Sequence, residues 1–295
     1  MTFANKIIMP TKFGTEVFIM KKLIALSLAL IMCLFAFVGC SVENADAPAA
    51  DDTTEAPKQK LIVGYTLYEP MNYKDASGNL VGFDTELAQL VAAKLGMDVE
   101  FKLIEWSNKY LELESGAINC IWNGFTSNCA DDDGIQRSDK VDFSYAYMNN
   151  EQCVVVKAEN AATLNTAQAL ADKKGAAEEG SAGEGVVKGF LADEKNYIGC
   201  AAQTATLNEL MSGNVQFVVI DKTMAKTIIG KGDYASLTIV DSIEIPSEKY
   251  SVGFKKGSDL TAKVNGAIKE LAADGTLAAL AEKYGLSNYV ITEYN

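Results

Sequence analysis

The sequence predicts an α/β fold in which mainly parallel sheets are flanked by helices. From residue 60 onwards, short apolar runs typical of strands alternate with amphipathic runs typical of helices. Consecutive strands joined through a helix pair in parallel, so this alternation predicts parallel sheets covered by helices on both faces. A hydrophobic content of 48% over 295 residues is enough for one large or two medium domains.

The first predicted unit is a βαβ unit. Residues 61–65 are an apolar strand, residues 84–95 an amphipathic helix, and residues 99–104 the next strand. Asp84 is expected as the N-cap of the helix, because its carboxylate can accept a hydrogen bond from the first turn. Gly96 follows the last helical residue, where glycine is favoured.

The remaining predicted elements continue the alternation. In chain order they are helix 110–115, strand 117–122, strand 152–156, helices 163–172, 185–191 and 204–212, strand 215–220 and helix 222–229.

An apolar run near the N-terminus predicts export. Residues 23–38 are apolar almost throughout and follow Lys21 and Lys22. These 16 residues fall short of the roughly 20 that cross a bilayer as a permanent helix, and a basic flank is typical of a secretory signal. We therefore interpret residues 1–39 as a signal segment.

The residues at the end of this run predict a lipid anchor. Phe37, Val38, Gly39 and Cys40 resemble the lipobox of bacterial lipoproteins, which implies a diacylglyceryl group on Cys40. The alternative is an ordinary cleaved signal that leaves a free cysteine. Residues 40–59 are the expected lipidated N-terminus and a flexible linker, because they are rich in Ala, Asp, Thr and Pro.

The composition excludes several classes of function. The chain has no histidine, which rules out Ser-His-Asp and Cys-His catalysis and imidazole metal ligands. Its net charge of −13 argues against nucleic acid as a partner, because phosphate binding depends on clustered Lys and Arg. The cysteines follow no CxxC spacing, so the sequence predicts no metal, no cofactor and no particular disulfide.

Candidate ligand contacts come directly after predicted strands, because ligands of parallel sheets bind outside the carboxyl ends of the strands. Tyr65 ends the first strand. Asn123, Gly124, Phe125 and Thr126 follow strand 117–122.

Asp221 is a further candidate because it directly follows the apolar strand 215–220. A carboxylate in this position has lost much of its water and needs a partner. The alternative is that Asp221 only caps helix 222–229.

Three longer segments match a known family. They are LIVGYTLYEPMNYKDASGNLVGFDTELAQLVAAKLG, VDFSYAYMNNEQCVVVK and KVNGAIKELAADGTLAALAEKYG. Together they resemble solute-binding protein family 3, the polar amino-acid-binding proteins of ABC importers. The resemblance extends over residues 60–289, and the order and spacing of the segments make it specific.

This resemblance implies a two-lobed, periplasmic-binding-protein-like fold that holds one amino acid in the cleft between its lobes. Each lobe would be a mainly parallel sheet flanked by helices. The chain would cross between the lobes at two hinges, near residues 147–152 and 246–251. The large lobe would be discontinuous, with residues 60–148 and 250–295, and residues 149–249 would form the small lobe.

The family also implies how the ligand carboxylate is bound. An Arg shortly before an Asp-Phe-Ser motif clamps the carboxylate in the family, and Arg137 has that spacing before Asp142. However, about six extra residues, with three consecutive aspartates at 131–133, separate Thr126 from Arg137. The alternative is therefore that Arg137 is a surface residue paired with these acids.

Other residues match ligand-binding positions of the family. Asp221 corresponds to the aspartate that binds the ligand ammonium group. Ser181 and Ala182 correspond to a helix start that faces the ligand carboxylate, and Ser181 with Glu184 also fits a capping box. Glu178 lies where Gln or Lys is common, and a carboxylate there favours a donor-bearing or cationic ligand side chain.

Aromatic residues complete the expected site. Tyr68 and Trp106 lie where the family has aromatic residues that line the side-chain pocket, although both could instead belong to the core. Tyr65 replaces an acid found in several members of the family.

The function implied is that of an extracytoplasmic, membrane-anchored lipoprotein without enzymatic activity. It would capture a polar or charged amino acid by hinge closure and deliver it, as a monomer, to the transmembrane subunits of an ABC permease. One alternative is an exported enzyme on the same scaffold, similar to cyclohexadienyl dehydratases, with Glu178 or Asp221 as acid or base. Another is an amino-acid sensing module.

Overall fold

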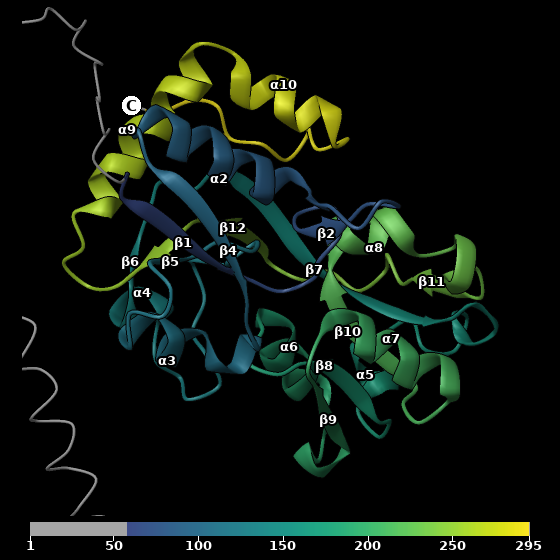
Figure 1. The fold of residues 1–295 in the computed structure, drawn as a ribbon. Coiled ribbons are helices and arrows are strands. Elements are labelled where there is room, and N and C mark those ends of the chain that lie inside the picture. The colour runs from purple at the N-terminus through teal and green to yellow at the C-terminus, as the bar shows by residue number, and fades with distance from the viewer. Residues whose placement is uncertain (1–57, 295) are drawn as a thin grey trace, which may run out of the picture. The chain divides into compact units, whose positions relative to one another are not determined.

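The computed structural model describes residues 58–294 (Figure 1). The predicted signal segment, Cys40 and all but the end of the 40–59 linker lie outside these residues. Within 58–294, none of the helices combines the length and apolarity needed to cross a bilayer.

The first sheet is built mainly from the N-terminal part of this region. Its strands, in spatial order, are β4 (Asp98–Leu103), β1 (Lys60–Tyr65), β5 (Cys120–Ile121), β13 (Gly253–Phe254) and β6 (Asp142–Phe143). β1 is parallel to β4 and β5, as the βαβ pattern predicts. β13 returns from near the C-terminus and is antiparallel to both neighbours.

The second sheet is built from the middle of the chain. Its strands, in spatial order, are β11 (Leu237–Ile239), β7 (Met148–Lys157), β10 (Phe217–Asp221), β8 (Gly175–Glu178) and β9 (Tyr197–Cys200). β8, β9 and β10 are parallel, whereas β7 is antiparallel to β10 and β11. The α/β class is therefore confirmed, and both sheets are mixed because strands from other parts of the chain run against the parallel set.

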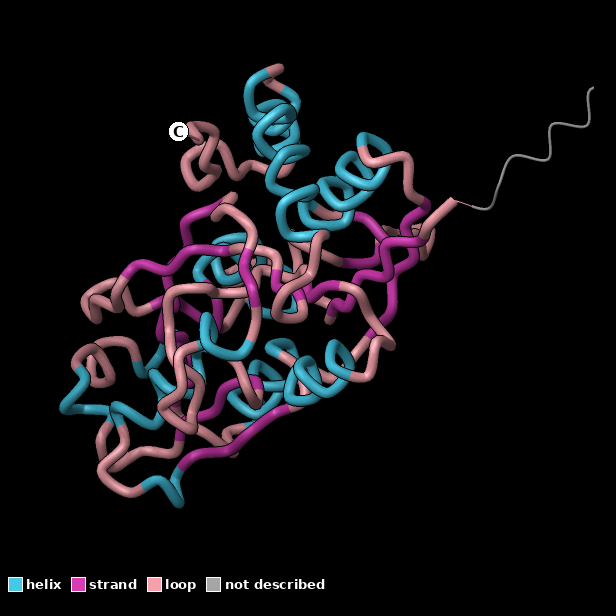
Figure 2. The backbone as a smooth tube through the Cα atoms, turned by 90° about the vertical axis from the view of Figure 1, so that its left-hand side faces the viewer, coloured by secondary structure: helices cyan, strands magenta, loops and turns pink. Residues whose placement is uncertain are grey.

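Helices cover these sheets. They are α2 (Phe83–Lys94), α3 (Lys109–Glu114), α4 (Arg137–Lys140), α5 (Ala167–Leu170), α6 (Ala182–Phe190), α7 (Gln203–Ser212), α8 (Lys222–Ile228), α9 (Leu260–Ala273) and α10 (Thr276–Lys283). α2, α9 and α10 pack together beside the first sheet, with apolar side chains such as Val91, Ile268 and Leu277 fully buried between them and the sheet (Figures 1 and 2).

Two strand segments link the parts of the chain that carry the two sheets. β12 (Ser247–Tyr250) pairs antiparallel with the start of β7, with Tyr250 opposite Met148 and Ser247 opposite Glu151. These paired segments coincide with the two crossings expected at 147–152 and 246–251. The lobe boundaries themselves remain a prediction.

Some local predictions differ from the structure. Helix 163–172 is reduced to the short α5, and strand 117–122 to β5. Asp84 is not the N-cap of α2, because Gly82 takes that position. The Asp84 carboxylate instead accepts hydrogen bonds from the Gly124 amide at 2.7 Å and the Tyr147 hydroxyl at 2.9 Å, so it supports a neighbouring loop.

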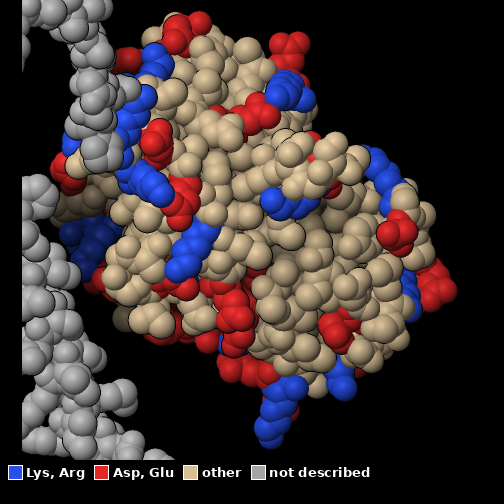
Figure 3. Space-filling view, in the orientation of Figure 1, with Lys and Arg blue, Asp and Glu red and all other residues tan. Residues whose placement is uncertain are grey.

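The acid excess is visible on the molecular surface. In Figure 3, acidic side chains gather in the lower middle of the face shown, and Lys and Arg are scattered around them. Within the region described, no group of three or more acidic or cysteine side chains is arranged to hold a metal ion.

Candidate functional site

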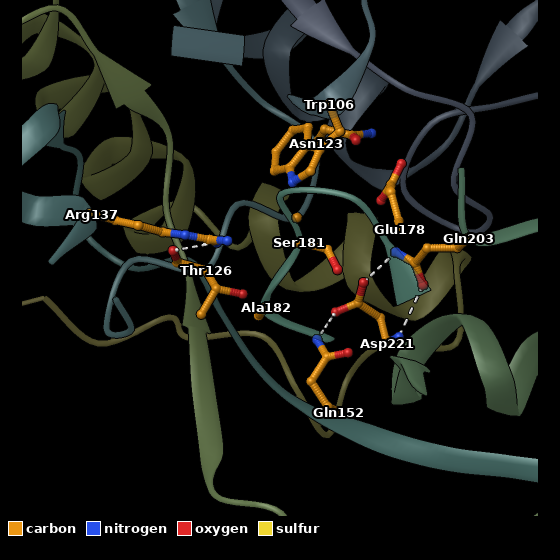
Figure 4. A pocket seen from close by; sticks show the side chains of 11 residues that line it. Trp106, Asn123, Thr126, Arg137, Gln152, Glu178, Ser181, Ala182, Gln203 and Asp221 are labelled. Atoms are coloured by element: carbon orange, nitrogen blue, oxygen red, sulfur yellow. Dashed lines mark hydrogen bonds between the residues drawn. The ribbon is translucent and has the colours of Figure 1, made fainter. Parts of the chain in front are cut away.

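One cavity brings together residues of the second sheet and residues of loops and helices that follow strands of both sheets (Figure 4). The side chains and backbone that line it belong to Trp106, Asn123, Gly124, Thr126, Arg137, Gln152, Glu178, Ser181, Ala182, Gln203 and Asp221. Nine of these 11 residues are among the candidates from the sequence, and Gln152 and Gln203 are additions.

Asp221, the last residue of β10, is the most densely hydrogen-bonded of these residues. Its Oδ1 accepts from Asn150 Nδ2 at 2.7 Å, Gln152 Nε2 at 2.8 Å and the Tyr250 hydroxyl at 2.6 Å, and its Oδ2 accepts from Gln203 Nε2. It stands at the N-cap position of α8, but its side chain makes no capping bond. Burial raises its pKa, and the donors act in the opposite direction by stabilising the charge.

Glu248 is a second buried carboxylate beside Asp221, on β12. Its Oε2 accepts from Thr126 Oγ1, Asn150 Nδ2 and Gln152 Nε2, each at 3.1 Å. Burial and the nearby Asp221 charge raise the pKa of Glu248 to about 7. The amides of Asn150 and Gln152 therefore join the two carboxylates into one network.

Arg137 is buried at the start of α4 and points into the cavity from the opposite side (Figure 4). Nη1 donates to the Thr126 carbonyl at 3.2 Å and Nη2 to the Gly180 carbonyl at 3.1 Å. The guanidinium lies over the Phe125 ring, 5.1 Å from its centroid. With 1% of its surface exposed, Arg137 is not a surface residue.

The inserted segment before Arg137 contacts the edge of the guanidinium that faces away from the cavity. Asp131 Oδ1 accepts from Arg137 Nε at 2.7 Å, and Asp131 Oδ2 accepts from Tyr110 at 2.6 Å and Lys140 at 2.8 Å. Burial alone would raise the pKa of Asp131, but Arg137, Lys140 and Tyr110 outweigh it and lower the pKa to about 2. Arg137 thus pairs with an inserted acid, as in the alternative, but it is buried and lines the cavity rather than lying on the surface.

The same segment contacts α6. Asp132 pairs with Lys188 at 2.7 Å, and Lys188 also pairs with Glu184 one turn earlier at 2.9 Å. The insertion therefore adds an ion pair between a loop that follows the first sheet and a helix that covers the second.

Ser181 and Ala182 form the N-terminal end of α6 at the cavity. Ser181 is the N-cap, and its Oγ accepts from the Glu184 amide at 3.3 Å. Glu184 Oε2 accepts from the Gly180 amide at 2.7 Å, one residue before the position that the predicted capping box requires. Amides of the first helical turn lack acceptors within the helix, so this end favours an anion.

The loop after β5 needs glycine at one position. Gly124 has φ +56°, and a Cβ there would come within 2.7 Å of Tyr68 Cε1. Beside it, the Asn123 amide is held by the Thr66 hydroxyl and carbonyl and by Asn72. These contacts fix the backbone that leads to Thr126.

Aromatic residues form one wall of the cavity and the layer behind it. Trp106 lines the cavity and packs edge-on against Phe125, with ring centroids 5.3 Å apart. Phe125 is fully buried behind Trp106 and Arg137 and does not line the cavity. Lys109 Nζ, beside these rings, donates to the Gly180 carbonyl at 2.9 Å.

Tyr65 and Tyr68 do not line the cavity either. Tyr65 packs edge-on against Phe101. The Tyr68 hydroxyl bonds to Thr223 and to Tyr250, which in turn donates to Asp221. Tyr68 therefore contacts the Asp221 network indirectly in this structure, and ligand stacking by either tyrosine remains a prediction.

Glu178 ends β8, the strand next to β10, so its carboxylate lies at the same sheet edge as Asp221. It is 4% exposed, and its Oε1 has no hydrogen-bond partner among the described residues. Burial, with Asp221 nearby, raises the pKa of Glu178 from the ordinary 4.5 to about 8, and Lys109 opposes the shift.

Several residues of this site were not candidates from the sequence: Asn150, Gln152, Gln203, Glu248 and Tyr250. Asn150 and Gln152 are two residues apart in a strand, so their side chains share one face, and this spacing was an available signal. Glu248 and Tyr250 carry no such signal, because only the pairing of β12 with β7 brings them to Asp221.

Comparison with known proteins agrees with this geometry. The family model of bacterial extracellular solute-binding proteins, family 3, matches residues 61–287. This chain belongs to that family.

Two curated relatives are similar to this chain over most of their length. The arginine-binding extracellular protein ArtP of Bacillus subtilis is 28% identical over 275 residues, which cover 90% of this chain and 98% of ArtP. The L-cystine-binding protein TcyJ of Escherichia coli K12 is also 28% identical, and the match covers 86% of this chain and 92% of TcyJ. Two relatives with different named ligands are thus about equally similar to this chain.

A solved structure supports the fold. An ancestral arginine-binding protein bound to arginine superposes with a TM-score of 0.69 at 31% identity, covering 78% of this chain and 99% of that protein. The predicted family and the periplasmic-binding-protein-like fold are confirmed.

Proposed function

We propose that this family 3 protein captures an amino acid outside the cytoplasm in the cavity between Arg137 and Asp221. The observation that carries the proposal is that these two opposite charges, both at least 93% buried, line one cavity from opposite sides. An amino acid at neutral pH is a zwitterion, so it presents one group to each charge.

The ligand carboxylate is assigned to the Arg137 side. A guanidinium binds a carboxylate through two parallel N–H groups, and the first amides of α6 add further donors. Arg137 Nη1 and Nη2 now donate to the carbonyls of Thr126, which lines the cavity, and of Gly180, which directly precedes the lining residue Ser181.

The ligand ammonium group is assigned to the Asp221 side. Asp221 Oδ1 already accepts three hydrogen bonds, whereas Oδ2 accepts one, from Gln203. A carboxylate oxygen can accept more than one donor, so Oδ2 retains capacity for an ammonium N–H.

We propose hinge closure as the mechanism of capture. β7 and β12 pair where the chain is predicted to cross between the lobes, and the residues that line the cavity come from both predicted lobes. A ligand that bridges two lobes favours the closed form by its extra contacts there. The closed form would then deliver the amino acid to an ABC permease, while lipid on Cys40 holds the protein at the membrane.

A thermal-shift panel of the twenty amino acids tests the proposal. A ligand that binds only the folded state raises its melting temperature, so one or a few polar or charged L-amino acids should do so. No response to any of them at millimolar concentration would contradict the proposed function.

A further inference from the structure

The cavity has one acidic side chain more than a neutral amino acid would use. Among the described residues that line it, Arg137 carries the one positive charge, and Glu178 and Asp221 supply two carboxyl groups. A zwitterion would use Arg137 and Asp221 and leave Glu178 without a partner. We infer, on the basis of the proposed function, that the ligand is an amino acid whose side chain is positively charged and lies against Glu178.

Glu178 differs in its contacts from Asp221 and Glu248, two other buried carboxylates at this end of the second sheet. Asp84 Oδ1 also lacks a partner, but Asp84 Oδ2 accepts from the Gly124 amide and the Tyr147 hydroxyl. Asp221 has four donors and Glu248 has three, all from side chains of the protein. Glu178 Oε1 has no hydrogen-bond partner within the described residues, although the side chain is 96% buried. A buried acceptor without a donor destabilises the protein unless something binds to it.

Lys109 does not neutralise Glu178 by direct contact. Its Nζ donates to the Gly180 carbonyl at 2.9 Å and to the Trp106 carbonyl at 3.4 Å, and it lies over the rings of Trp106 and Tyr110. Burial, followed by the charge of Arg137, lowers the pKa of Lys109 to about 7, so it is a weak source of positive charge here.

The direction of the Glu178 side chain fits a ligand side chain and not the ligand ammonium group. In Figure 4 its carboxylate points away from Asp221 and toward the part of the cavity where Trp106 lies. The Trp106 ring can pack against an alkyl stem and attract a cation at its end. One subsite thus contains an aromatic ring and an unpaired carboxyl group. Without ligand this group is protonated at neutral pH, because its pKa is about 8, and an ammonium or guanidinium group on a flexible stem would favour its ionised form.

The test compares ligands that differ mainly in charge. L-Arginine and L-citrulline have nearly the same shape, and L-lysine and L-norleucine differ at the terminal ammonium group. Titration calorimetry on the wild-type protein should give L-arginine or L-lysine a roughly tenfold or larger preference over its neutral counterpart, as expected for a charged hydrogen bond.

Two variants show whether this preference depends on Glu178. Glu178→Gln keeps the size of the side chain and should reduce the preference to about twofold or less, while the neutral counterpart retains most of its affinity. Glu179→Gln, at the exposed neighbouring residue, should leave the preference unchanged.

Equal or better binding of the neutral counterparts, or a preference that persists in Glu178→Gln, would overturn this inference and leave the proposed function standing. Failure of every amino acid to bind would overturn both.

Discussion

Arg137 and Asp131 form a buried ion pair in which the guanidinium Nε lies 2.7 Å from Oδ1 of the carboxylate. This contact uses the edge of the guanidinium that faces away from the cavity and leaves Nη1 and Nη2 on the cavity side. The inserted acidic segment thus supplies the counter-ion that allows a buried arginine to serve the site.

Asp131→Asn should therefore weaken ligand binding. Removing one charge of a buried pair leaves the other without compensation and frees it to rotate, so we expect a loss of about tenfold or more in affinity by titration calorimetry. Asp133→Asn is the matched control, because Asp133 also pairs with Lys140 but does not contact Arg137. Wild-type affinity in Asp131→Asn would show that this pair does not position Arg137 for binding.

The ion pair between Asp132 and Lys188 should slow ligand release. It joins the inserted segment to α6, so it is expected to form only when the two lobes are closed. Because Asp132 is half exposed, the pair contributes at most about 1 kcal/mol. Asp132→Asn should raise the release rate about two- to fivefold in stopped-flow fluorescence, with a smaller effect in high salt.

Asp133→Asn should not change the release rate, since Asp133 pairs with Lys140 and accepts from the Ile135 amide, both near it in the chain, and makes no contact with α6. An unchanged release rate in Asp132→Asn would remove this pair from the closure mechanism.

The raised pKa of Glu178 predicts how stability without ligand depends on pH. Its pKa is about 8 in the folded state and has the ordinary value of 4.5 when unfolded, so between these pH values the folded state binds more protons. The free energy of unfolding should therefore fall as pH rises through this range. In Glu178→Gln, the free energy of unfolding should decrease less between pH 5 and pH 8. Urea unfolding at pH 5, 6.5 and 8 measures this decrease.

Glu248 and Asp221 also have raised pKa values, so some decrease should remain in Glu178→Gln. Parallel stability curves for the wild type and Glu178→Gln would mean that Glu178 does not hold a proton in the folded state.

Attachment to the membrane is predicted to depend on Cys40. Lipid on this residue, and not a spanning helix, is expected to hold the protein, so Cys40→Ala should move it from the membrane to the soluble fraction. Fractionation followed by immunoblotting measures this, and Cys33→Ala, within the signal segment, is the control. Tight membrane association of Cys40→Ala would indicate that residues 23–38 remain as an anchor.

The sequence predicted those parts of the site that follow parallel strands. Asp221 and the residues after β5 could be found because the carboxyl ends of such strands meet at one edge of the sheet. The family resemblance added Arg137, Glu178 and Ser181, which follow none of the strands predicted from the sequence. Glu178 ends β8, a parallel strand that was not predicted. Apart from Phe125, these candidates line one cavity.

The parts that were missed depend on long-range pairing. Glu248 and Tyr250 reach Asp221 through the antiparallel pairing of β12 with β7, which no local pattern indicates. The prediction for Asp84 was wrong for the same reason. Its position at the start of a helix predicts an N-cap, but its carboxylate instead accepts a hydrogen bond from a backbone amide 40 residues away in the chain.

Titration calorimetry on Asp221 variants tests the central claim most directly. With the best ligand from the amino-acid panel, Asp221→Ala should lose about 30-fold or more in affinity, because the ligand ammonium group loses its buried partner. Asp221→Asn should lose less affinity than Asp221→Ala, and Arg137→Ala should lose a similar amount to Asp221→Ala. The control Asp241→Asn, at an exposed position, should bind like the wild type. Wild-type affinity in both Asp221→Ala and Arg137→Ala, with folding intact by circular dichroism, would contradict the proposal that these two charges hold the ligand.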